Sequence, residues 1–118
     1  MVVELSELLG KTLSSIEVTG DDEVIFTTDD GAIYKLYHEQ DCCESVVVEE
    51  VIGDLADLVG APILMAEEVS NADAPVLPDE DSYTWTFYKF ATIKGYVTIR
   101  WLGTSNGYYS ESVDFMKV

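Results

Sequence analysis

Hydrophobic and polar residues alternate along much of this chain, and a period of two is typical of a β-strand with one buried face. Five segments before residue 70 show this alternation or a short apolar run between turn residues: 13–18, 23–28, 32–37, 45–51 and 63–69. Asp30 and Gly31 stand between the second and third segments, and an Asp-Gly pair is a strong signal for a tight hairpin. The first three segments therefore predict an antiparallel meander.

Two shorter segments carry helical signals. Residues 3–10 place three leucines on one face at helical spacing and end in glycine. Residues 53–60 predict two helical turns, with Asp54 as the N-cap. Residues 70–81, by contrast, contain two prolines and four acidic residues, which favours an exposed loop.

The last third of the chain is richest in aromatic residues and predicts long strands. Large and polar side chains alternate over residues 83–88 and again over 97–102. Asn106-Gly107 is a preferred type I′ hairpin pair, so residues 108–115 are predicted to return as a third antiparallel strand.

These elements together predict an α+β fold, in which one or two short helices pack on a mainly antiparallel, twisted sheet. We expect about six to eight strands, in line with the spacing of the strand and turn signals. A length of 118 residues and an apolar fraction of 47% predict a single domain over residues 1–118.

Charge adds the strongest restriction on partners. Six Lys and Arg stand against 23 Asp and Glu, for a net charge of −17. Such a surface repels phosphate and attracts basic protein surfaces, so we expect no direct binding to nucleic acid. No apolar run reaches the roughly 18 residues of a membrane span, and residues 1–9 lack the basic region of a signal peptide. We therefore expect no membrane association and a cytoplasmic location.

Reactive side chains are concentrated in residues 38–44, which hold an imidazole, three carboxylates and two thiols. In the structural interpretation, one cysteine is buried, and His38 and Asp41 bind backbone groups between two strands. A zinc site would combine His38 with a cysteine and a carboxylate, but adjacent Cys42 and Cys43 point apart in an extended chain. A cysteine nucleophile needs positive surroundings, whereas Glu44 and its neighbours are acidic. We therefore expect no catalytic residue, metal or cofactor here.

A second candidate region combines aromatic residues with cations. Four of the six Lys and Arg residues lie in residues 89–117, where Arg100 and Tyr109 are the positions of interest. Stacked aromatic rings and a cation can hold a base and a phosphate, which favours a small-ligand or nucleotide-signal binding protein as the alternative function. Ordinary core packing of the aromatic residues is the simpler interpretation.

Several blocks of sequence carry a family resemblance. They are Tyr-His-Glu-Gln-Asp-Cys-Cys-Glu at 37–44, the segment 53–68, and the aromatic blocks at 82–89 and 105–111. Over about residues 10–115 the chain resembles a family of small phage-encoded proteins of unknown function. The resemblance implies a phage or prophage origin and action inside a bacterial host cell. It implies no activity, so no functional residues are carried over.

We therefore expect a small, acidic, non-enzymatic phage accessory protein that binds and modulates a host protein, with host defence as one target. The alternatives are the nucleotide-signal binding protein and a metal- or cysteine-dependent enzyme centred on His38 and Cys42. The sequence leaves homo-oligomerisation open. The candidate ligand or partner residues are His38, Asp41, Cys42, Glu44, Arg100 and Tyr109.

Overall fold

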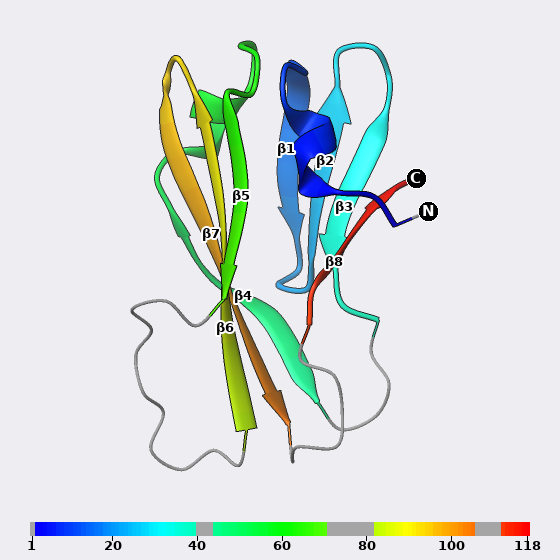
Figure 1. Ribbon diagram of the computed structural model, residues 1–118, viewed down its shortest axis with the longest axis vertical. Helices are drawn as coiled ribbons and strands as arrows, with labels where there is room; N and C mark the ends of the chain where they lie inside the picture. Colours follow the sequence, from blue (N-terminus) through cyan, green and yellow to red (C-terminus); the bar gives the residue numbers. More distant parts are fainter. Residues whose placement is uncertain (1, 40–43, 71–81, 106–111) are drawn as a thin grey trace.

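The computed structural model describes residues 2–39, 44–70, 82–105 and 112–118, which form two four-stranded antiparallel sheets (Figure 1). The first sheet has the order β1 (Leu13–Thr19), β2 (Glu23–Thr28), β3 (Ile33–Tyr37) and β8 (Asp114–Lys117). The second has the order β4 (Ser45–Ile52), β7 (Gly95–Ser105), β6 (Ser82–Thr92) and β5 (Met65–Ser70). All described strand pairs are antiparallel, so the mainly antiparallel part of the prediction is confirmed, whereas the strands form two sheets instead of the single sheet predicted.

The predicted meander forms β1, β2 and β3, and its second turn follows the Asp-Gly signal. Gly31 has a φ of 91°, which favours glycine. The Asp30 carboxylate accepts hydrogen bonds from the Thr28 hydroxyl and from the Ala32 amide, the latter at 3.3 Å. These bonds, that from Thr28 above all, stabilise the ionised carboxylate and lower the pKa of Asp30 below its usual 3.8.

The helical part of the α+β prediction is wrong for the described residues, which contain no α-helix. Both segments with helical signals form single 3₁₀ turns, η1 (Leu5–Leu8) and η2 (Leu55–Leu58). The Asp54 carboxylate accepts from the Ala56 amide at 2.9 Å, as expected of a cap. Segments this short do not offset the cost of nucleating an α-helix, so each makes one turn that buries a leucine, Leu8 or Leu58.

The last strand also differs from its predicted pairing. The described part of the C-terminal segment, β8, pairs with β3 in the first sheet and not with β7 in the second. Residues 106–111, which include the predicted hairpin pair, lie outside the described residues. Alternation predicts a strand and its buried face, but it does not predict which of two sheets the strand joins.

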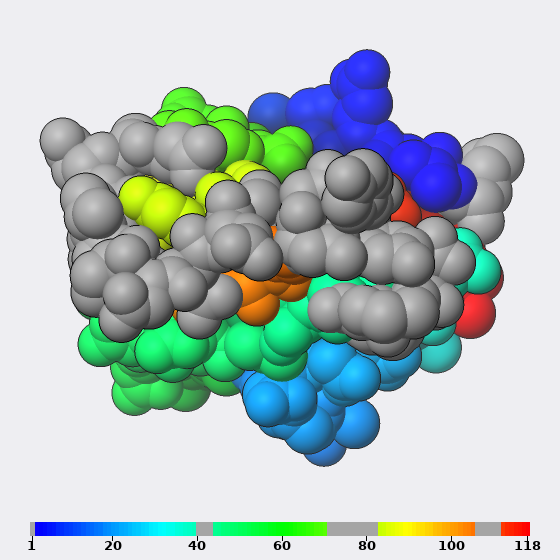
Figure 2. Space-filling model, turned by 90° about the horizontal axis from the view of Figure 1, so that it is seen from below, coloured from blue at the N-terminus to red at the C-terminus, as the bar shows by residue number. Residues whose placement is uncertain are grey.

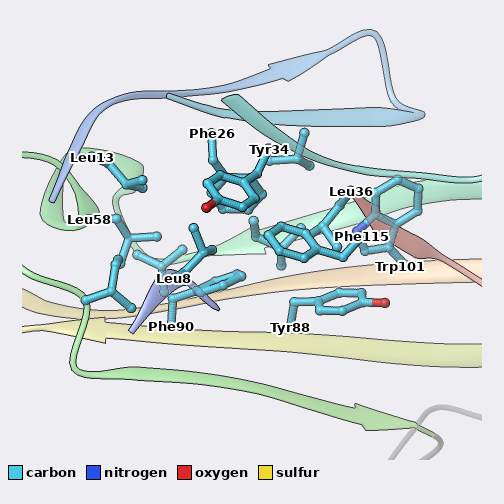
Figure 3. Close-up of a cluster of buried hydrophobic side chains, with 14 of the residues drawn as sticks. Leu8, Leu13, Phe26, Tyr34, Leu36, Leu58, Tyr88, Phe90, Trp101 and Phe115 are labelled. Atoms are coloured by element: carbon cyan, nitrogen blue, oxygen red, sulfur yellow. The ribbon is translucent and has the colours of Figure 1, made fainter. Parts of the chain in front are cut away.

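The two sheets share one hydrophobic core, in which aromatic rings from both meet (Figure 3). Phe26 of β2 and Phe90 of β6 have ring centroids 5.4 Å apart, which joins the sheets. Tyr34 of β3 stacks on Phe115 of β8 at 5.4 Å with an interplanar angle of 2°. Trp101 of β7 is fully buried. Among the described residues, no helix is long and apolar enough to cross a membrane.

Candidate functional site

A pocket of about 330 Å³ lies where the outer strand of each sheet meets the segment preceding η1. β5 is the last strand of the second sheet and β8 the last of the first, and residues 2–5 cross beside them. On the molecular surface, the blue N-terminal region borders the bright green of β5 (Figure 2). Nine described residues line the pocket: Val2, Val3, Glu4, Leu5, Glu68, Tyr88, Val113, Asp114 and Phe115.

Tyr88 supplies a buried polar group to this lining. It is 2% exposed and pairs across the strands with Glu68, whose Oε1 accepts from the Tyr88 hydroxyl at 3.1 Å. The Val113 carbonyl is a second acceptor, 3.4 Å away. Burial, followed by the negative charges of Glu68 and Asp114, raises the pKa of Tyr88 far above its usual value. The hydroxyl therefore stays protonated and donates to its acceptors.

Residues 2–5 form one wall because backbone hydrogen bonds hold them against β8. The Val3 amide donates to the Phe115 carbonyl at 3.0 Å, and Val2 forms a β-bridge with Met116. Glu4 follows at the start of η1, where its carbonyl accepts from the Glu7 amide at 3.0 Å. The first sheet thus extends past β8, and Glu4 comes to the pocket lining from a third chain segment.

His38 and Glu44 lie together beside the segment that leads into β8. The two side chains are 5% and 0% exposed, and His38 Nε2 lies 2.7 Å from Glu44 Oε2. His38 Nδ1 lies 2.7 Å from the Ser112 carbonyl oxygen and therefore carries a hydrogen. The other ring nitrogen lies at the same distance from a carboxyl oxygen of Glu44, so a second short hydrogen bond joins the imidazole to the carboxyl group. The pair fixes residue 112, directly before two residues of the pocket lining.

The pair and the pocket are connected through three consecutive residues. His38 binds Ser112, Tyr88 binds Val113, and Asp114 is the register partner of Tyr37, the neighbour of His38. The segment leading into β8 is therefore held from both sides. Of the predicted positions, the structure brings together His38 and Glu44; their role in binding stays a prediction.

Arg100 belongs to a different surface. Its neighbours on β7, Ile99 and Trp101, are buried, so the alternation directs Arg100 to the opposite face of the second sheet. Its Nη2 lies 3.0 Å from Glu50 Oε2, and its guanidinium carbon lies 4.9 Å from the centroid of the Trp85 ring. Arg100 is thus engaged by a carboxylate and an aromatic ring and does not line the pocket.

Asp41, Cys42 and Tyr109 lie outside the described residues. Within the part of the chain that the structure does describe, no group of three or more His, Cys, Asp or Glu side chains is arranged to hold a metal ion.

Sequence reasoning missed the polar residues of the pocket: Glu4, Glu68, Tyr88 and Asp114. One signal was available, because Tyr88 shares the inner face of its strand with Phe90 and a tyrosine in a core needs a partner for its hydroxyl. The pattern did not identify that partner, since Glu68 faces Tyr88 only through the register of β5 and β6.

Comparison with known proteins gives one match. The model of a family described as a domain of unknown function (DUF7448) matches residues 6–115, which include most of the pocket lining. No curated protein and no solved structure matches the chain.

Proposed function

The chain belongs to the DUF7448 family, a family of unknown function, and from its pocket we propose that it is a non-enzymatic binding protein for a basic partner. The pocket receives a positively charged group of that partner. The strongly acidic surface attracts the partner over a longer range.

The observation that carries this proposal is the charge of the pocket. Three acidic residues from three chain segments, Glu4, Glu68 and Asp114, line it, and the nine described lining residues include no Lys, Arg or His. A positively charged group entering this space gains attraction from each wall. The net charge of −17 gives the whole molecule the same preference.

The lining supports binding more than catalysis. The nine described lining residues offer carboxyl groups, the Tyr88 hydroxyl and apolar side chains, and none of the nine is a serine, cysteine, histidine or lysine that could act as a nucleophile. The alternative of an enzyme centred on His38 and Cys42 has weak support from His38, the one of the two residues that the structure describes. Both ring nitrogens of His38 already form hydrogen bonds, to Ser112 and to Glu44.

The nucleotide-signal alternative has weaker support than a basic partner. The carboxylates of the pocket repel phosphate, and the Arg100 guanidinium, the cation considered for that role, is paired with Glu50. A nucleotide would have to bind on another surface.

The origin of the partner rests on the resemblance to small phage-encoded proteins. We infer a phage accessory protein that acts in the cytoplasm of its bacterial host, where a host protein with a basic surface is the partner. This part of the proposal is independent of the pocket geometry.

Partner capture from a host lysate tests the proposal when the pocket charges are changed. We compare the wild type with the double variant Glu68→Gln/Asp114→Asn. The matched control is Glu17→Gln/Glu49→Gln, which removes the same charge from exposed positions outside the pocket.

We expect the wild type and the control to retain one basic protein at low salt and to release it as salt rises, because screening weakens exposed charges. The pocket variant should lose it at all salt concentrations. Equal capture by the pocket variant and the control would overturn the proposal.

A further inference from the structure

We propose that the pocket is a binding site for an aliphatic amine, meaning a methylene chain that carries one or more ammonium groups. This chemistry is shared by a lysine side chain of a protein partner and by free di- and polyamines. The inference rests on the proposed function and specifies the chemical group that the pocket receives.

The first argument is the mixture of apolar and acidic lining. Val2, Val3, Leu5 and Val113 provide aliphatic surface between the carboxylates. A volume of about 330 Å³ is at the small end of ligand pockets, which span roughly 300–1,000 Å³. The space therefore suits a single side chain or a small molecule, with methylene groups against the apolar side chains and ammonium groups at the acids.

The second argument is the distribution of the carboxylates. Glu4 lies before η1, Glu68 on β5 and Asp114 on β8, and in the described residues they do not form a cluster able to hold a metal ion. A compact divalent cation needs several oxygens in one coordination shell. A flexible chain with separated positive charges instead matches carboxylates on separate walls.

The third argument distinguishes an ammonium from a guanidinium group. Arginine binds best where it stacks on an aromatic face or meets a carboxylate bidentately. The two aromatic residues of the lining, Tyr88 and Phe115, are only 2% and 6% exposed, and Phe115 is already stacked on Tyr34. An ammonium group needs no ring face, and its rotatable donors adapt to acceptors in several directions.

Calorimetric titration with defined amines tests the inference. Putrescine and spermidine are compared with arcaine, in which guanidinium groups replace both amines of putrescine, and with Mg²⁺. We expect the amines to bind the wild type and to bind Glu68→Gln/Asp114→Asn at least about 10-fold more weakly, as for the loss of a charged hydrogen bond. Glu17→Gln/Glu49→Gln should keep wild-type affinity, and circular dichroism verifies that each variant is folded.

Amide NMR locates the site, with shifts expected at Val3, Tyr88 and Asp114. Nα-acetyl-lysine methylamide identifies the source of the amine: tighter binding than putrescine indicates a partner's lysine, and weaker binding indicates a free amine. The inference is overturned if no amine binds the wild type, if arcaine or Mg²⁺ binds as tightly as the amines, or if both double variants bind alike. If amines fail while partner capture still depends on the pocket charges, the ligand class is wrong and the proposed function stands.

Discussion

Replacement of Glu44 by alanine tests the buried contact between Glu44 and His38. The variant leaves a buried imidazole facing a void where a carboxyl oxygen lay 2.7 Å away. Since the two side chains are 0% and 5% exposed, water does not replace the lost partner. Removal of one member of such a pair typically costs about 3–5 kcal/mol. This is a large part of the roughly 5–15 kcal/mol by which proteins of this kind are stable.

A double-mutant cycle separates the contact from other effects of each substitution. The free energy of unfolding is measured in urea at pH 7 for the wild type, Glu44→Ala, His38→Ala and the double variant. We expect a coupling energy of about 1–3 kcal/mol, because a hydrogen bond joins the two groups. Glu44→Gln, which keeps the shape and one hydrogen bond, should lose less than Glu44→Ala.

Hydrogen exchange in the Glu44→Ala variant tests whether the contact between His38 and Glu44 also positions the pocket residues Val113 and Asp114. In Glu44→Ala, hydrogen exchange at the amides of Val113 and Asp114 should accelerate more than exchange in the core strands, since Ser112 loses a fixed anchor. Additive single effects, with coupling under about 0.5 kcal/mol, would refute the reasoning. So would an unchanged exchange rate at these two amides.

Three further outcomes are expected from urea unfolding. Gly53→Ala should lower the free energy of unfolding by about 1–3 kcal/mol more than Gly10→Ala does. Both glycines have a positive φ, but of the two only Gly53 has a backbone oxygen 2.6 Å from the position of an added Cβ. Equal losses for the two variants would contradict this reasoning. Phe115→Ala should cost about 3–5 kcal/mol because the ring is 6% exposed and stacks on Tyr34, and a loss under about 1 kcal/mol would show that the stack is not formed. Because the pKa of Asp30 is lower in the folded state than in the unfolded state, its ionised carboxylate stabilises the fold at pH values above the unfolded-state pKa. This stabilisation is lost as the pH falls through the folded-state pKa. The stability difference between the wild type and Asp30→Asn should therefore shrink on acidification, and a constant difference would contradict the reasoning.

Local features of the fold were predictable from the sequence. The meander follows from alternation and from the Asp30-Gly31 turn, and both act between neighbouring residues. The pairing of β8 with β3 was not predictable, because Leu36 meets Phe115 only through a contact between distant segments. The 3₁₀ turns were mistaken for helices because leucines three residues apart, Leu5 with Leu8 and Leu55 with Leu58, also fit a single 3₁₀ turn.

The candidate site likewise has one part that the sequence pointed to and one part that only the tertiary structure brings together. His38 and Glu44 are six residues apart, and their segment was singled out for its chemistry before their contact was seen. The pocket acids come from three distant segments, and an exposed glutamate such as Glu68 resembles every other surface acid in the sequence. Only the register of β5 on β6 brings it to the Tyr88 hydroxyl.

The position of β8 has a consequence for synthesis on the ribosome. The first three strands emerge early, yet β3 keeps an unpaired edge until residues 114–117 are made. An unpaired strand edge invites wrong association, so the nascent chain is most vulnerable while the entire second sheet is being translated. The pocket walls come from residues 2–5, β5, β6 and the segment at β8. Incomplete chains therefore lack the pocket, which is complete only after the last strand has docked.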